Sequence, residues 1–305
     1  MSEKCSHDCS SCSSNCSSRK KESFRKQPHK NSSIKKVIGI VSGKGGVGKS
    51  NLAVNLAIQL RKKGQRVIIF DADFGLANVE VMFGVIPQYN LSDLIYHGKS
   101  IQEIITKGPM DIGFISGGSG ILGLNNLYRE QIMLLVKSIG ELNEYADVII
   151  IDTGAGVSDQ VLEFVLASPE VIMVTTPEPS SLTDSYSLLK AMYRNPNFIE
   201  DGTTIHVVAN KVNSVEEGRM VYDKLHSVVD QFLDGELNYL GMIPQDTALE
   251  RSVRQQKTVS LHEPNSNAAK AFEVLATNLL EGTHNEIQMH RGIAQIFSHL
   301  LNRNK

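Results

Sequence analysis

The chain has 305 residues, of which 41% are hydrophobic and 21% charged, and its formal net charge is −2. This composition is typical of a globular protein, and the nearly balanced charge favours neither nucleic acid nor a membrane as a bulk partner. No apolar run approaches the ~20 residues that span a bilayer, and the polar N-terminus does not resemble a secretory signal. The four cysteines are clustered near the N-terminus, so no disulfide framework runs through the chain and we expect a cytoplasmic protein.

Residues 1–35 are predicted to form a disordered tail ahead of the folded part. They are rich in Ser, Lys, Arg and His and nearly lack apolar residues, a composition that cannot bury enough surface to fold. The cysteines follow the pattern C-x3-C-x2-C-x3-C, at Cys5, Cys9, Cys12 and Cys16. Four clustered thiolates could hold zinc or an iron–sulfur cluster, or they could be incidental thiols of a disordered tail. The basic residues between positions 19 and 36 favour a solvated linker over an arm that binds anionic lipid or nucleic acid.

From position 36 onward, short apolar runs alternate with helical ones. Continuous, mainly β-branched runs at 37–41, 67–70, 148–151, 171–174 and 205–208 are typical of strands buried on both faces of a sheet. Helical runs such as 161–166 and 180–193 lie between them. This order predicts a doubly wound α/β domain over residues 36–283, with a mostly parallel sheet and its ligands at the carboxyl ends of the strands.

A phosphate-binding motif follows the first predicted strand. Gly43-Lys44-Gly45-Gly46-Val47-Gly48-Lys49-Ser50 fits G-x-x-x-x-G-K-[ST], and Asn51 continues it into a helical run. In such a loop, backbone N–H groups and the helix N-terminus surround a phosphate. Lys49 is placed to reach the β- and γ-phosphates, and the Ser50 hydroxyl is placed to bind Mg²⁺. The motif therefore predicts a P-loop NTPase that takes a nucleoside triphosphate with Mg²⁺.

Aspartates follow two of the other predicted strands. Asp71 and Asp73 come directly after the run at 67–70, and Asp152 comes directly after the run at 148–151. Carboxylates at strand ends can serve Mg²⁺ and an attacking water, so these three residues are candidates for both tasks.

The early lysine gives the loop a family resemblance. With Lys44 directly after the first glycine, K-G-G-x-G-K-[ST] resembles the deviant phosphate loop of the MinD/ParA ATPases, which are P-loop NTPases of the SIMIBI type. The resemblance implies an ATP-dependent homodimer in which Lys44 reaches the nucleotide held by the other subunit. It also implies that Asp71 supports the Mg²⁺ shell, that Asp73 positions the hydrolytic water and that Asp152 holds Mg²⁺. Lys44, Lys49 and Asp73 are thus the residues expected to carry ATP hydrolysis.

Three more segments resemble the same family. Val208-Ala209-Asn210-Lys211-Val212 ends a predicted strand, and by resemblance the Asn210 amide reads adenine. The resemblance also places Pro244 and Asp246, in a G-x-I-P-x-D segment, beside the base and the ribose. The segment 175–185, T-x-P-E-x-x-S-x-x-D-S, is expected to help form the dimer face.

The branch of the family is indicated by segments 79–85, 89–94 and 114–120, which resemble FlhG, the MinD-like ATPases that control flagellar number and placement. This resemblance implies work with the flagellar GTPase FlhF and with basal-body proteins. The N-terminal D-Q-A-x-x-L-R element of many FlhG proteins is absent, and a cysteine segment similar to that of Mrp/Nbp-type ATPases stands in its place.

That cysteine segment makes an iron–sulfur carrier ATPase the second hypothesis. Against it, no C-x-x-C pair follows the core, because no cysteine occurs after Cys16. ParA-like DNA partitioning is the third hypothesis, and a net charge of −2 does not favour it.

Residues 284–305 are predicted to form a C-terminal amphipathic helix. The apolar residues at helical spacing on one face are Met289, Ile293, Ile296, Phe297, Leu300 and Leu301. Such a helix can lie in a membrane interface, or it can dock on the parent domain or a partner. Resemblance to MinD-type proteins favours reversible contact with the inner face of the cell membrane, stronger in a dimer because two helices then act together.

Overall fold

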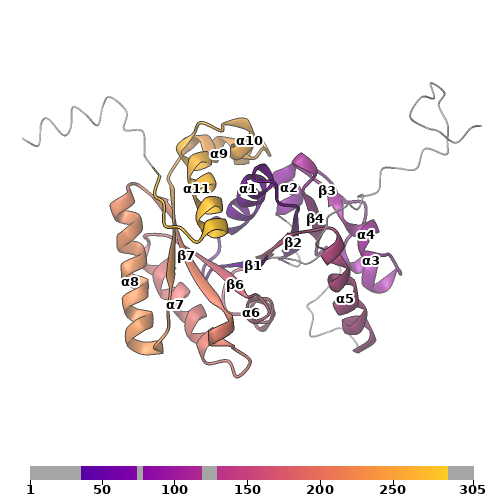
Figure 1. The fold of residues 1–305 in the computed structure, drawn as a ribbon, viewed down its shortest axis with the longest axis horizontal. Helices are drawn as coiled ribbons and strands as arrows, with labels where there is room; N and C mark the ends of the chain where they lie inside the picture. The colour runs from indigo at the N-terminus through magenta and orange to yellow at the C-terminus, as the bar shows by residue number, and fades with distance from the viewer. Residues whose placement is uncertain (1–35, 74–77, 119–128, 288–305) are drawn as a thin grey trace, which may run out of the picture.

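The computed structural model describes residues 36–73, 78–118 and 129–287, which are arranged around one eight-stranded sheet (Figure 1). The strand order is β3-β4-β2-β5-β1-β6-β7-β8. The strands are β1 (Lys36–Val41), β2 (Val67–Ala72), β3 (Thr106–Lys107), β4 (Gly113–Ser116), β5 (Val148–Thr153), β6 (Glu170–Thr175), β7 (Thr204–Val212) and β8 (Asn238–Pro244). All neighbouring pairs are parallel except β3 with β4. The predicted doubly wound, mostly parallel fold is therefore confirmed.

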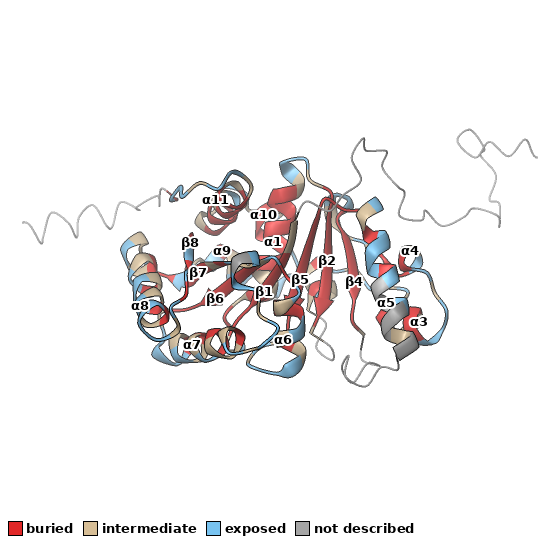
Figure 2. Ribbon diagram, turned by 60° about the horizontal axis from the view of Figure 1, so that its bottom comes forward, coloured by how far each residue is buried: buried red, intermediate tan, exposed pale blue. Residues whose placement is uncertain are grey.

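Helices cover both faces of the sheet. They are α1 (Lys49–Lys62), α2 (Val79–Phe83), α3 (Leu91–Tyr96), α4 (Ile101–Ile104), α5 (Arg129–Glu141), α6 (Asp159–Leu166), α7 (Pro179–Tyr193), α8 (Val215–Leu233), α9 (Thr247–Arg254), α10 (Val259–His262) and α11 (Asn267–Glu281). Short 3₁₀ turns lie at Pro109–Asp111, Leu142–Glu144 and Glu200–Gly202. Helices α1, α2, α9, α10 and α11 lie on one side of the sheet, whereas α6, α7 and α8 lie on the other (Figures 1 and 2).

The strands are buried because both faces are covered, as Figure 2 shows. Ile69 and Ile150 belong to the apolar cluster that includes α1 and α11. Their neighbours Ile68 and Ile149 point the other way, into a cluster with α3, α4 and α6. The side chains of such a strand enter a hydrophobic core on each face of the sheet, so every position has to be apolar. This explains the continuous apolar runs in the sequence.

A buried ion pair helps set the register of the two strands that bear aspartates. The Arg66 guanidinium lies 3.1 Å from the Asp147 carboxylate, and both side chains are buried. The same two residues are joined through their backbones, because the Asp147 N–H donates to the Arg66 carbonyl at 2.8 Å. They precede β2 and β5, and the resulting register places Asp71 opposite Asp152 at the carboxyl edge of the sheet.

After α11 the chain continues without regular structure through residues 283–287. The buried Asn278 holds this segment: its amide donates to the carbonyls of Leu240 and Asn285, and it accepts a bond from the Asn285 N–H, all at 2.9 Å. The remaining residues of the predicted C-terminal helix, 288–305, lie outside the described residues, as does the predicted tail, 1–35. Within the described ranges, none of the helices combines the length and the apolar character that crossing a membrane requires.

Candidate functional site

The phosphate loop joins β1 to α1 at the carboxyl edge of the sheet. Gly46 and Gly48 have φ values of 75° and 100°, in the left-handed region that glycine adopts without strain. Gly43 is required for another reason, because a Cβ there would overlap the backbone of Asp184 and Ser185 in α7. The glycines thus allow both the turn into α1 and the close approach of α7 to the loop.

The two lysines of the motif have different partners. Lys49 is buried, and its Nζ donates to the Ser42 hydroxyl at 2.9 Å. That hydroxyl donates to the Lys44 carbonyl at 2.7 Å. The Lys44 side chain is more exposed and lies 2.7 Å from the Glu178 carboxylate and 3.0 Å from the Ser180 hydroxyl. Lys49 therefore faces the interior of the site, and Lys44 lies along the start of α7.

Asp152 is a buried carboxylate without a hydrogen-bonding partner. It is 0% exposed, and neither of its oxygens makes a bond of normal geometry. Burial and the nearby charge of Asp71 raise the pKa of Asp152 to about 7, although the Ser50 hydroxyl and the Lys49 charge work in the opposite direction. Burial likewise lowers the pKa of Lys49, while the charges of Asp152 and Asp73 raise it. The oxygens of Asp152 and the hydroxyl of Ser50 are hard donors that suit Mg²⁺, so these residues fit the predicted metal.

Asp71 is placed beside Asp152 but is already engaged. Its carboxylate accepts bonds from the backbone N–H groups of Asp73 at 3.2 Å, Asn78 at 2.9 Å and Val79 at 3.1 Å. It thereby ties the end of β2 to the start of α2. Burial raises the pKa of Asp71 to about 6. Three backbone donors leave little room for direct coordination, which favours contact with a hydrated cation through water.

Asp73 is half-buried and lies near enough to Lys49 to respond to its charge. Burial raises its pKa, and the charge of Lys49 lowers it. Gly154, at the end of β5, packs close to the Asp73 carboxylate. Residues 74–77, which follow in the same predicted segment, lie outside the described residues.

A cavity of about 340 Å³ opens beside the loop. It is lined by Gly46, Gly48, Asn51, Asn210, Lys211, Pro244, Gln245, Asp246, Leu249, Glu250, Val253 and Arg254. The structure thus brings the predicted Asn210, Pro244 and Asp246 together with the phosphate loop. The apolar side chains of Leu249 and Val253 give the cavity a wall on which a flat base can lie.

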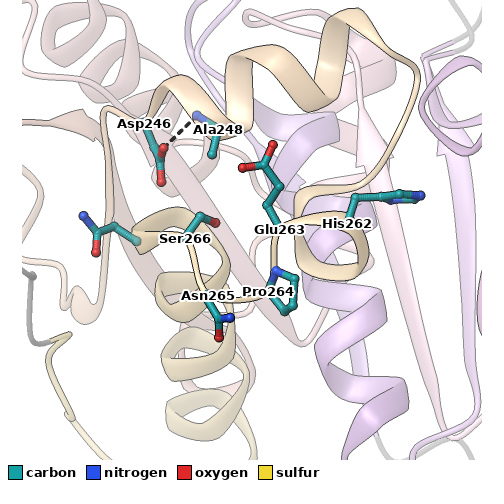
Figure 3. Close-up of a pocket in the computed structure, with 8 residues that line it drawn as sticks. Asp246, Ala248, His262, Glu263, Pro264, Asn265 and Ser266 are labelled. Atoms are coloured by element: carbon teal, nitrogen blue, oxygen red, sulfur yellow. Dashed lines mark hydrogen bonds between the residues drawn. The ribbon is translucent and has the colours of Figure 1, made fainter.

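Asp246 shapes this region through its backbone contacts (Figure 3). Its carboxylate accepts bonds from the N–H groups of Ala248 at 2.8 Å and Ala268 at 2.9 Å, so it caps α9 and ties α9 to α11. A second cavity, of about 480 Å³, lies between Asp246 and the turn that joins α10 to α11. The Glu263 carboxylate there pairs with Arg251 at 2.6 Å. This second cavity shares Asp246 with the cavity beside the phosphate loop.

The predicted metal at the cysteines has no structural support, because Cys5, Cys9, Cys12 and Cys16 lie outside the described residues. Within residues 36–73, 78–118 and 129–287, no three His, Cys, Asp or Glu side chains form a metal site by themselves. A cation at Asp152 would therefore depend on nucleotide oxygens, Ser50 and water to complete its shell.

Comparison with known proteins decides the family. A family model described as "ParA: NUBPL iron-transfer P-loop NTPase" matches residues 33–280. The chain belongs to the ParA/MinD family of P-loop NTPases. It is 38% identical to the antiactivator FleN of Pseudomonas aeruginosa over 240 residues, which cover 79% of this chain and 84% of FleN. It is 36% identical to the flagellum site-determining protein YlxH of Helicobacter pylori over 251 residues, 79% of this chain and 80% of YlxH.

Solved structures of the ParA/MinD family share the fold. The septum site-determining protein MinD of Pyrococcus horikoshii, solved with Mg-ADP, superposes with a TM-score of 0.63 and 25% sequence identity. The match covers 81% of this chain and 97% of that one. A relative that binds Mg-ADP agrees with ATP and Mg²⁺ as the ligands expected of this ParA/MinD ATPase.

Three residues of the site were not predicted from the sequence. Ser42 links Lys49 to the loop, and its carbonyl accepts a bond from the Gly156 N–H at 3.0 Å. Glu178 holds Lys44, and Lys211 contacts the loop from β7. Glu178 lies inside the segment 175–185 that resembles the family, so its negative charge, opposite in sign to that of Lys44, was the available signal. Ser42 and Lys211 act on backbone carbonyls, which no sequence pattern reveals.

The raised pKa of the buried Asp152 predicts how stability depends on pH. In the unfolded chain this carboxyl loses its proton near its ordinary pKa, but the folded chain retains the proton up to about pH 7. The folded state therefore binds more protons between those values, and the free energy of unfolding falls as the pH rises through this window.

In nucleotide- and metal-free protein, Asp152→Asn should raise the free energy of unfolding by on the order of 2 kcal/mol at pH 8 and by much less at pH 5. Urea denaturation at both pH values measures this.

Asp230→Asn, at an exposed position on α8, is the matched control and should change stability little at either pH. Equal stability of wild type and Asp152→Asn at pH 8 would contradict the assignment of a buried carboxyl with a raised pKa.

Proposed function

We propose that this chain is a MinD-like ATPase switch that regulates the number or placement of flagella. The observation that carries the proposal is the identity of 38% with FleN and 36% with YlxH, each over 79% of this chain. The names of those two proteins describe an antiactivator and a flagellum site-determining protein. The phosphate loop, with Asp71 and Asp152 beside it, supports a nucleotide as the signal that the switch reads.

The chemistry that we propose is attack of water on the γ-phosphate of ATP, which forms one P–O bond and breaks the bond to the ADP leaving group. Asp73, half-buried near Lys49, orients the water. Lys49 contacts the β- and γ-phosphates and offsets the charge that develops on them. Ser50 and Asp152, supported by Asp71, would hold Mg²⁺, which would neutralise phosphate charge. The backbone N–H groups of the loop position the phosphates.

ATP would also bring two copies of the chain together. In the single chain, Lys44 is held by Glu178 and Ser180. We propose that in the dimer Lys44 leaves these partners and reaches the nucleotide of the other subunit. Because the loop packs on α7 through Gly43, a change in the loop is passed to the segment 175–185 that we assign to the dimer face. ATP then stabilises the dimer by its higher affinity for that state.

By the same resemblance, we propose the flagellar GTPase FlhF and basal-body proteins as partners. Reversible contact with the inner face of the cell membrane, through the predicted helix within residues 284–305, is part of this proposal. The protein would then be cytoplasmic in its monomeric state and would lie at the membrane as a dimer.

An iron–sulfur carrier ATPase is the second candidate, because the description of the family model includes iron transfer. Its support is weaker, since the only cysteines are Cys5, Cys9, Cys12 and Cys16 and none lies within residues 36–283. Assays of iron and acid-labile sulfide after anaerobic purification test this candidate. A cluster that transfers to an apo-acceptor would favour it over the flagellar proposal.

The proposed roles of Asp73 and Lys44 are separable by mutation. Asp73→Ala should lower ATP turnover by about 10²-fold or more because the water loses its orienting group, and it should trap an ATP-bound dimer. Lys44→Ala should lose ATP-dependent dimerisation, because the contact across the interface is removed. Phosphate release and light scattering measure the two effects.

Asp223→Ala, at an exposed position on α8, is the control and should behave as wild type in both assays. Undiminished ATP turnover in Asp73→Ala would contradict the proposed catalytic role of Asp73. A normal ATP-driven mass increase in Lys44→Ala would count against the shared site.

The cellular role is tested by deleting the gene in its own host and counting flagella by electron microscopy. We expect a changed number or position of flagella. Wild-type protein should restore the pattern, and Lys49→Ala should fail to do so because it cannot hold the nucleotide phosphates. Unchanged flagella after deletion would overturn the flagellar assignment while leaving the ATPase assignment intact.

A further inference from the structure

The carboxyl end of β7 departs from regular strand geometry at Lys211. The register between β7 and β8 shifts between Asn210 and Val212, and Lys211 has a φ of 58°. A residue with a side chain is strained at positive φ, and such strain persists where the surrounding structure maintains it. Strand irregularities beside functional sites often redirect a side chain.

The redirected side chains reach the back of the phosphate loop. Asn210 is 4% exposed, and its Nδ2 donates to the Val47 carbonyl at 2.6 Å. The Lys211 Nζ donates to the Gly46 carbonyl at 2.9 Å. The Lys211 N–H donates to the Asn210 Oδ1 at 2.8 Å, which fixes the orientation of the Asn210 amide. Two successive residues of β7 therefore hold two successive carbonyls of the loop.

These two bonds set the direction of two N–H groups. A trans peptide is planar, so its C=O and N–H point in opposite directions. The Gly46 carbonyl shares a peptide with the Val47 N–H, and the Val47 carbonyl shares one with the Gly48 N–H. Because both carbonyls are bonded to side chains of β7, both N–H groups point away from those side chains. Successive N–H groups that face the same way form a concavity that binds anions.

We propose that Asn210 and Lys211 are positioning residues that brace the phosphate loop from outside, so that the Val47 and Gly48 N–H groups face a bound polyphosphate. This inference rests on the proposed function, in which the loop holds ATP. It differs from the expected reading of adenine by Asn210, because the brace acts on the phosphates whatever base is attached. The second hydrogen of the Asn210 amide remains available to a base.

A ligand without a base separates the two roles. We would measure the binding of inorganic tripolyphosphate and of ATP, each with Mg²⁺, by isothermal titration calorimetry. Asn210→Ala and Lys211→Met should each weaken both ligands by about three- to ten-fold, the effect of losing one hydrogen bond that orders the loop. Lys211→Arg should restore most of the affinity, because it returns a donor and a positive charge at the same position.

Lys224→Met is the matched control, because Lys224 is exposed on α8, lines neither cavity, and the change removes an equal charge. It should leave tripolyphosphate affinity near the wild-type value. Asn210→Ala changes no charge, so weakened tripolyphosphate binding in that variant supports the brace independently of electrostatics. Thermal melting confirms that each variant is folded.

Unchanged tripolyphosphate affinity in both Asn210→Ala and Lys211→Met would overturn the proposal that these residues brace the loop. This holds even if the two variants bind ATP more weakly. If wild-type protein bound neither tripolyphosphate nor ATP, the proposed function itself would be contradicted. If wild type binds both and the variants bind tripolyphosphate equally well, the brace alone is wrong.

Discussion

The buried carboxylate of Asp152 is the constraint on which the rest of the site depends. It lies at the carboxyl end of a central strand, is fully buried and has no hydrogen-bonding partner of normal geometry. An isolated buried charge is costly, so the neighbours that reduce the cost define the site. Lys49 offers a positive charge from the start of α1, Ser50 offers a hydroxyl, and the register of β2 brings Asp71 alongside. The same arrangement leaves acceptor oxygens for the cation that accompanies a nucleoside triphosphate.

The phosphate loop is held by elements on several sides, which links it to the rest of the molecule. Gly43 packs against the backbone of α7, and the Ser42 carbonyl accepts the Gly156 N–H beyond β5. The side chains at the end of β7 hold the Gly46 and Val47 carbonyls. A loop with these contacts cannot move alone. Binding of nucleotide would therefore also shift α7, the turn after β5 and Lys44, which contacts Glu178 and Ser180 at the N-terminus of α7.

Much of the fold followed from the sequence because its signals are local. The runs at 37–41, 67–70, 148–151, 171–174 and 205–208 lie in strands, and the helical run at 180–193 lies in α7. The phosphate loop and the three aspartates were found because each follows an apolar strand directly. By contrast, no strand was predicted for the segment from Leu240 to Pro244, which forms most of β8. Gly241, in an otherwise apolar run, obscured the strand, and its φ of 144° marks an irregularity there.

The contacts within the site were less predictable, because they join residues that are far apart in the chain. Asp246 is predicted beside the ribose, and its two oxygens also accept bonds from backbone N–H groups of α9 and α11, which the sequence did not indicate. The partners of Asn210 and Lys211 lie more than 160 residues away and are backbone carbonyls, which carry no sequence signal. The pairing of Lys44 with Glu178 likewise depends on how α7 lies over the loop. Sequence patterns locate such residues at the correct edge of the sheet and leave their partners undetermined.

The central claim is that Asp152 completes its environment with a cation that ATP brings. The most direct test is to measure ATP affinity by isothermal titration calorimetry with and without Mg²⁺, in wild type and in Asp152→Asn. The account predicts that Mg²⁺ strengthens ATP binding strongly in wild type and has little effect in the variant. Equal enhancement by Mg²⁺ in both proteins would contradict it.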